Sequence, residues 1–194
     1  MWLYKFLESP RIYNLSVKLT SLNHRGLRRY ILKLIKVEPN DCLLDVGCGT
    51  GKYAIFPCKY FGIDINENYI NYAKRNHPGI FLEMDGADLK FPDAKFDFVI
   101  NISTLHHVAD DLVEKMIIEM KRVCKKGGSI FIIDAVYPKK INFLGYILFK
   151  LDRGRYRRRF EDLKKLLSKF HFKLVSSGIR KTFPYRWVAF SCEC

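Results

Sequence analysis

The stretch LLDVGCGTGKY (Leu43–Tyr53) combines an apolar run, an acidic residue and three glycines at alternate positions. A buried parallel strand is a continuous apolar run, and glycines in the turn after it let a ligand approach the backbone closely. In open α/β sheets, ligands bind beyond the carboxyl ends of the strands. The stretch therefore predicts an α/β fold in which Asp45, Gly47, Gly49 and Gly51 form the floor of a nucleotide-type pocket. A tight turn without a ligand is the simpler alternative.

A second acidic residue follows at the distance expected for a carboxylate that binds a ribose. The segment YFGIDIN places Asp64 about 20 residues beyond the first glycine, after a short apolar run. The glycines follow the pattern G-x-G-x-G, so the dinucleotide fingerprint G-x-G-x-x-G is not met. A cofactor without phosphate needs only close backbone approach and carboxylates for its hydroxyls and amines, and these residues supply both.

Apolar runs alternate with helical patterns along the chain, which predicts a doubly wound sheet of mainly parallel strands. Pro57 makes the first crossover short or irregular. Asp110 is the expected N-cap of a helix that Gly127 and Gly128 end. Apolar residues at helical spacing over 2–37 predict two or three helices ahead of the sheet. Strands are expected over 42–46, 60–64, 80–84, 96–102, 129–134, 172–177 and 186–192, and further helices over 67–76 and 160–170.

As a set, these motifs resemble those of class I S-adenosylmethionine (SAM) dependent methyltransferases. LLDVGCGTGKY resembles motif I of that family, and FGIDIN, EMDGADLKFP, FDFVINISTLHHV and MKRVCKKGGSIFIID resemble its later segments in order. The resemblance is to small bacterial and archaeal enzymes of the methyltransferase domain 11 or 25 type. It implies a Rossmann-like, seven-stranded, mostly parallel sheet in the order 3-2-1-4-5-7-6. It also implies one domain over 1–194, with a helical cap over 1–38 and the core over 39–194.

The same resemblance implies SAM as cofactor and S-adenosylhomocysteine (SAH) as product. The glycines would approach the methionine part, Asp64 the ribose hydroxyls, and Asp85 the adenine amino group. Asn101 would offer an oxygen to the methionine ammonium. Turn and strand-end capping is the other interpretation of Asp85 and Asn101. The expected cofactor-binding residues are Asp45, Gly47, Cys48, Gly49, Gly51, Asp64, Ile65, Asp85, Gly86, Asn101 and Ile102.

A histidine pair follows the fourth strand, near the place where the methyl group would leave. Histidine titrates near neutrality, so His106 or His107 is a candidate catalytic base for an oxygen or nitrogen acceptor. Packing, or capping of the next helix, is the competing interpretation for either ring. Tyr4, Tyr13 and His24 are further candidates for the pocket.

Five arginines gather in the segment LDRGRYRRRF after the fifth strand. Arginine in a dense patch suits bidentate binding of phosphate or carboxylate. The segment resembles the tail of small class I methyltransferases, some of which belong to glycan pathways. That resemblance places Asp152, Arg153 and Arg158 on the acceptor side, while a surface loop tied by Asp–Arg pairs is the alternative.

Three functions compete. The first is methyl transfer from SAM to an oxygen or nitrogen of a small-molecule or glycan-type acceptor. The second is methylation of a tRNA wobble uridine, because VGCGTGKY, the short crossover after it and INISTLHHV also resemble eukaryotic wobble-uridine tRNA methyltransferases. The net charge of +14 suits RNA as well. The third is a non-catalytic SAM-fold binding or scaffold protein, against which the intact glycine motif and both acidic residues argue.

The chain of 194 residues has no apolar run of the length that spans a membrane and no secretory signal pattern at its start. We expect a cytoplasmic protein with no membrane span. The six cysteines form no C-x-x-C pair, so we expect six thiols and no metal site.

Overall fold

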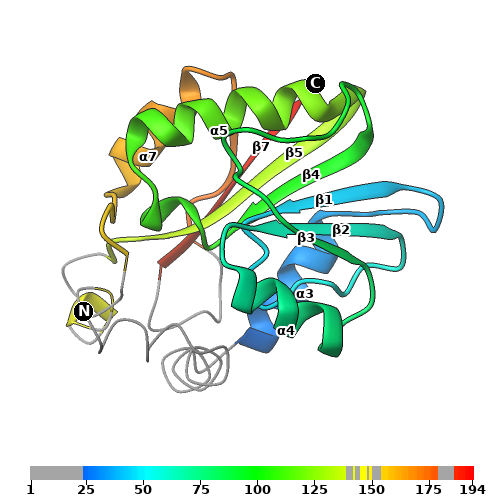
Figure 1. Cartoon of the computed structure of the whole chain (residues 1–194). Coiled ribbons are helices and arrows are strands. Elements are labelled where there is room, and N and C mark those ends of the chain that lie inside the picture. Colours follow the sequence, from blue (N-terminus) through cyan, green and yellow to red (C-terminus); the bar gives the residue numbers. More distant parts are fainter. Residues whose placement is uncertain (1–23, 139–141, 143–144, 148, 150–153, 179–185) are drawn as a thin grey trace.

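The computed structural model describes residues 24–138, 142, 145–147, 149, 154–178 and 186–194. Its centre is one seven-stranded sheet in the order β3-β2-β1-β4-β5-β7-β6 (Figure 1), which confirms the predicted order. All neighbouring strands run parallel except β7, which is antiparallel to both β5 and β6. The strands are β1 (Cys42–Val46), β2 (Lys59–Asp64), β3 (Ile80–Glu83), β4 (Phe96–Ile102), β5 (Cys124–Val136), β6 (Lys173–Ser176) and β7 (Arg186–Glu193).

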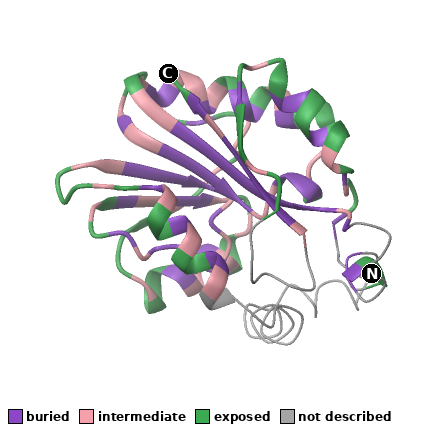
Figure 2. Cartoon of the chain, turned by 180° about the vertical axis from the view of Figure 1, so that it is seen from behind, coloured by how far each residue is buried: buried purple, intermediate pink, exposed green. Residues whose placement is uncertain are grey.

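Helices cover both faces of the sheet. On one face lie α3 (His24–Leu34) and α4 (Glu67–Asn76), and on the other lie α5 (Asp110–Val123) and α7 (Phe160–Ser168), as Figure 1 shows. Each face has its own apolar cluster, because side chains of a strand alternate between the two faces. The buried residues concentrate in the middle strands (Figure 2), as expected for strands covered on both faces.

The helix α5 buries one stripe of apolar residues against the sheet. Its N-cap is Ala109, which makes no side-chain capping bond, so the expectation that Asp110 caps this helix is wrong. Asp110 is the first helical residue and accepts a hydrogen bond from Arg158 instead. The buried stripe consists of Val113, Met116, Ile117, Met120 and Val123.

The end of α5 also differs from the expectation. The helix ends at Val123, and Cys124 already has the extended backbone of β5 and pairs with Phe96. Gly127 and Gly128 therefore lie inside the strand, where the pairing of β4 with β5 shifts register. This irregularity in the ladder contains the residues that the sequence pattern assigned to the helix end.

The crossover from β1 to β2 was expected to be short or irregular, and it contains no helix: residues 47–58 form turns and bends. The loop is held by backbone hydrogen bonds instead. The N–H groups of Gly47 and Cys48 both donate to the carbonyl of Ile63, each at 2.8 Å. These bonds fix the glycine motif to the carboxyl end of β2.

Within the described part of the chain, no helix has the length and apolarity that a membrane crossing requires. All six cysteines are free thiols. The described residues also bring together no group of three or more His, Cys, Asp or Glu side chains that could hold a metal ion.

The orientation of α5 can be tested with two consecutive isoleucines. Ile117 is completely buried against the sheet, whereas Ile118 is 57% exposed. We expect Ile117→Ala to lower the free energy of unfolding by about 2–4 kcal/mol, because it leaves a cavity in a packed core. Ile118→Ala is the matched control and should change it by less than about 0.5 kcal/mol. Equal losses in urea denaturation would contradict this orientation.

Candidate functional site

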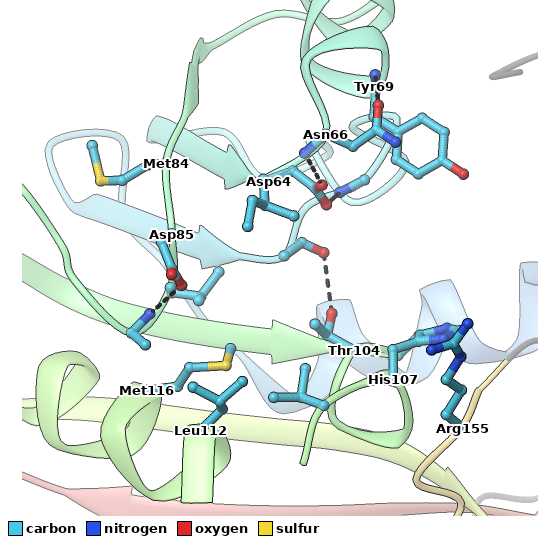
Figure 3. A pocket seen from close by; sticks show the side chains of 18 residues that line it. Asp64, Asn66, Tyr69, Met84, Asp85, Thr104, His107, Leu112, Met116 and Arg155 are labelled. Carbon is cyan, nitrogen blue, oxygen red and sulfur yellow. Dashed lines mark hydrogen bonds between the residues drawn. The ribbon is translucent and has the colours of Figure 1, made fainter. Parts of the chain in front are cut away.

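A cavity of about 480 Å³ opens at the carboxyl ends of β1, β2 and β4 (Figure 3). It lies where the chain order of the strands reverses, between β1 and β4. Six of the residues expected to bind the cofactor line it, together with one of the two candidate bases. These seven are Gly47, Gly49, Asp64, Ile65, Asp85, Gly86 and His107.

Asp64 ends β2 and joins the glycine loop to the start of α4. One carboxylate oxygen accepts from the N–H of Gly49, and the other accepts from the N–H of Asn66, each at 2.9 Å (Figure 3). Burial raises the pKa of Asp64, and these two hydrogen bonds oppose that rise. A carboxylate has about four lone-pair positions, so both oxygens can still accept from the hydroxyls of a ligand.

The glycine loop owes its shape to backbone conformations that favour glycine. Gly47, Gly49 and Gly51 all have positive φ angles, of 77°, 56° and 78°. A Cβ at Gly49 would meet no atom within 4 Å, so open space lies over this residue. A Cβ at Gly47 would lie 2.5 Å from Thr104 Cγ2, and a Cβ at Gly51 would lie 3.0 Å from the His77 ring. Gly47 therefore permits the close approach of β1 and β4, and Gly51 permits the packing of α4.

Two exposed residues suit the adenosine part of the expected cofactor. Ile65 lines the cavity and is 71% exposed, so its side chain is accessible to a planar ring. Asp85 accepts from the N–H of Ala87 at 2.8 Å, so it does cap a turn. Its second oxygen has no hydrogen bond to the described residues and can accept from an amino group.

The other end of the cavity is built from the turn after β4. Ser103 has a positive φ of 62°, and the Thr104 hydroxyl donates to the carbonyl of Gly47 at 3.2 Å (Figure 3). His107 belongs to the short 3₁₀ helix η1 (Leu105–His107), is exposed and lines the cavity. An imidazole thus lies in the same cavity as the glycine loop.

His106 does not line the cavity, in contrast to its neighbour. Its side chain is 5% exposed, and its Nδ1 lies 2.6 Å from Asp134 Oδ1 at the carboxyl end of β5. Its backbone N–H donates to the other oxygen of Asp134 at 3.0 Å. The His106 and His107 rings are 4.1 Å apart between centroids. The Asp134–His106 pair is therefore a buried support for the turn that carries His107.

The arginine cluster divides between the interior and the cavity. Arg158 was expected on the acceptor side, but it is 8% exposed and its guanidinium binds protein groups. It donates to the carbonyls of Leu105 and Val108, at 2.6 and 2.7 Å, and to Asp110. Arg155, which the sequence did not single out, lines the cavity instead. The expectation for Arg158 is wrong because its hydrogen bonds to the 105–110 turn use its guanidinium.

Five residues expected to bind the cofactor do not line the cavity. Asp45 and Asn101 are completely buried, and Asn101 Nδ2 donates to the carbonyl of Val46 at 2.8 Å. Asn101 therefore ties β4 to β1 beneath the cavity, and its Oδ1 has no partner among the described residues. Cys48, Gly51 and Ile102 are the other three, and all lie in the packed interior.

Asp45 forms a buried pair with Tyr60 on the neighbouring strand. The tyrosine hydroxyl donates to one carboxylate oxygen at 2.5 Å, and the other oxygen has no partner among the described residues. Burial raises the pKa of Asp45 to about 7, although the hydrogen bond from Tyr60 lowers it. Asp45 thus ties β1 to β2 through Tyr60 and does not line the cavity, although the sequence placed it on the floor of the pocket.

Several residues that line the cavity were not expected there from the sequence. Asn66, Tyr69 and Thr104 carry no motif that marks a pocket, and Met116 belongs to the apolar stripe of α5, whose spacing does not show that it reaches the cavity. Thr104 could have been found from its place three residues after Asn101, in the loop after β4. His24 starts α3, and the candidates Tyr4, Tyr13, Asp152 and Arg153 lie outside the described residues.

Two glycine substitutions distinguish the cost of backbone strain from the cost of a steric collision at the site. Gly47 and Gly127 have nearly the same φ, 77° and 78°, but a Cβ at Gly127 meets open space. We expect Gly127→Ala to cost about 1 kcal/mol of stability from the left-handed backbone alone. Gly47→Ala should cost more, because the new methyl group collides with Thr104, and should weaken SAH binding at least tenfold in calorimetry. Equal effects of the two substitutions would contradict the close contact at Thr104.

Asp45 should make stability depend on pH. Its pKa is raised in the folded chain, so the folded state binds more protons than the unfolded state between about pH 4 and pH 7. The free energy of unfolding should therefore fall as the pH rises through this window, by at most about 4 kcal/mol from this group. Asp45→Asn should flatten the fall without abolishing it, because burial also raises the pKa of Asp64. Urea denaturation at a series of pH values measures this, and an unchanged slope would contradict it.

Comparison with known proteins agrees with this geometry. Residues 44–132 match the model of a family described as a methyltransferase domain. Demethylmenaquinone methyltransferase from Bacillus cereus is 29% identical over 140 residues, which are 65% of this chain and 58% of that protein. The matched part thus spans less than two thirds of the relative.

Solved structures share the fold. PH0226 protein from Pyrococcus horikoshii OT3 superposes with a TM-score of 0.69 at 19% identity, over 94% of this chain and 92% of that one. A SAM-dependent methyltransferase from Methanosarcina mazei gives 0.61 at 21% identity, over 80% and 92%. At these identities the likeness concerns the fold alone.

The residues of the cavity fit SAM. Open space above Gly49, an uncovered Ile65 and two carboxylates that can accept further hydrogen bonds suit a ribose, an adenine and a backbone-bound methionine part. Sheet order, motif and family match lead to the same class. Residues 44–132 of this chain match a methyltransferase domain, and the chain's sheet order and glycine motif are similar to those of class I SAM-dependent methyltransferases.

Proposed function

We propose that this chain transfers a methyl group to an oxygen or nitrogen of a small-molecule or glycan-type acceptor, with His107 as the base. The observation that carries the proposal is that one cavity contains both Asp64 with the glycine loop and the exposed imidazole of His107. The donor site and a proton acceptor are thus open to one another.

The donor side would be held by groups that the structure already orders. Asp64 offers lone pairs to the ribose hydroxyls, while its own bonds to Gly49 and Asn66 keep it in place. Asp85 offers its second oxygen to the adenine amino group, and Ile65 lies against the ring. The backbone at Gly49 is accessible to the methionine part.

When bound, SAM supplies a methyl group on a positively charged sulfur, which is already activated for displacement. The chain has two tasks: it must align the acceptor with that methyl group, and it must remove the acceptor's proton. A neutral imidazole at His107 can accept the proton and release it to solvent, because the side chain is exposed. His106 and Asp134 keep the turn of His107 in position from the interior.

Two variants test the two halves of the proposal. Asp64→Asn should weaken SAH binding at least tenfold in calorimetry, because the amide nitrogen cannot accept a hydrogen bond. His107→Asn should leave SAH binding within twofold and lower methyl transfer by about 10²–10⁴-fold. His171→Asn is the control: this exposed histidine precedes β6, at the opposite end of the sheet, and its loss should change neither measurement.

Acceptors can be screened with methyl-labelled SAM against phenols, amines, sugars and bulk tRNA. Transfer to phenols, amines or sugars that His107→Asn reduces would support the proposal. Transfer to tRNA alone, with binding that weakens steeply with salt, would replace it with RNA methylation. Normal SAH binding by Asp64→Asn would contradict the proposed donor site.

A further inference from the structure

The arginine that lines the cavity belongs to a segment fixed firmly to the rest of the site. The N–H of Tyr156 donates to the carbonyl of His106 at 3.0 Å, and the N–H of Tyr137 donates to the carbonyl of Arg158 at 3.2 Å. Arg158 adds its bonds to Leu105, Val108 and Asp110. The residues that follow Arg155 are thus bound to η1 and to Tyr137, the residue after β5.

Arg155 itself is the part of this segment that remains available. It is exposed, lines the cavity and makes no hydrogen bond or ion pair with the described residues. By contrast, Arg122 binds Glu119 and Asp93, and Arg158 binds Asp110. A guanidinium has five N–H donors in a rigid fork that matches a carboxylate or a phosphate. The guanidinium of Arg155 therefore has N–H donors available at the cavity, with no partner among the described residues.

Its position places that fork at the acceptor end. The bond from Tyr156 to His106 holds Arg155 next to the turn of His107, and Figure 3 shows both side chains at the end of the cavity opposite Met84 and Asp85. The cavity thus has the Asp85 carboxylate at one end and the Arg155 guanidinium at the other. A sulfonium donor is itself a cation, so an anion bound at the guanidinium would offset the repulsion between the two positive charges.

We infer that Arg155 binds an anionic group of the methyl acceptor, a phosphate or a carboxylate, and so selects acceptors that carry one. The inference rests on the proposed function, because it takes the His107 end of the cavity as the acceptor side. The inference restricts the class of acceptor to small molecules or glycans that carry a negative charge near the oxygen or nitrogen that receives the methyl group. Arg155 is then a specificity-determining residue, and Arg158 positions it.

The test uses the full chain saturated with SAH and two probes, inorganic phosphate and acetate, at constant ionic strength. The Arg155 Nε–H resonance, assigned by its loss in Arg155→Gln, reports binding at that side chain. We expect it to shift with a Kd below about 50 mM for at least one of the probes. The probe that binds more tightly distinguishes a phosphate-bearing acceptor from a carboxylate-bearing one.

Calorimetry on three variants then measures the affinity for phosphate or acetate. Arg155→Gln should weaken this affinity about tenfold. Arg155→Lys should weaken it less, because lysine keeps the positive charge but cannot donate two parallel hydrogen bonds. Arg159→Gln is the matched control, since it removes the same charge from an exposed arginine of the same cluster, and it should stay within twofold. All three should bind SAH within twofold of the unchanged chain.

Other outcomes would overturn the inference. If Arg155→Gln bound both probes as tightly as the unchanged chain does, or if the Arg155 resonance did not shift, Arg155 would not bind an anion. Weaker SAH binding by Arg155→Gln, with unchanged probe binding, would show that Arg155 holds the carboxylate of the donor. Failure of the unchanged chain to bind SAH would reject the proposed function, while the resonance measured without SAH would still show whether Arg155 binds an anion.

Discussion

The carbonyl of Ile63 and the carboxylate of Asp64 hold the glycine loop, and the whole site depends on that contact. Three consecutive residues of the loop, Gly47, Cys48 and Gly49, each donate a backbone N–H to the end of β2. The crossover has no helix, so these backbone hydrogen bonds fix its start, while Tyr53, Ala54 and Phe56 pack into the core. Once the loop is fixed, Thr104 can pack on Gly47, and the turn that carries His107 follows from β4.

Much of this arrangement could be predicted from the sequence, because it follows from patterns along the chain. An apolar run before Asp45 and another before Asp64 predicted two parallel strands, and the glycines marked the turn between them. The strand order came from the family resemblance, since the antiparallel placement of β7 leaves no mark in the spacing. The helix end at Val123 was missed, because β5 begins before the glycines and a shift of register accommodates them within the strand.

The direction of individual side chains was the harder problem. His106 and His107 are adjacent and chemically identical, but His106 is the one bonded to Asp134 and packed on Phe149, and its ring is buried. In the same way Arg155, Arg158 and Arg159 share one cluster, yet the carbonyls of the 105–108 turn take up Arg158. Asp45 and Asn101 are close in sequence to residues that line the cavity, but both side chains are buried beneath it. Such choices depend on contacts between residues about 30 to 55 positions apart, which periodicity does not record.

The Arg158 contacts have a consequence for how enzymes of this shape can diverge. One buried guanidinium joins the 105–110 turn to the segment after β5, so the frame around the cavity does not rely on the side chain at position 155. Evolution, or an engineer, can then exchange that side chain for another without rebuilding the scaffold beneath it. The proposed selectivity for the acceptor then depends on one side chain, and the architecture around the cavity stays constant when that side chain changes.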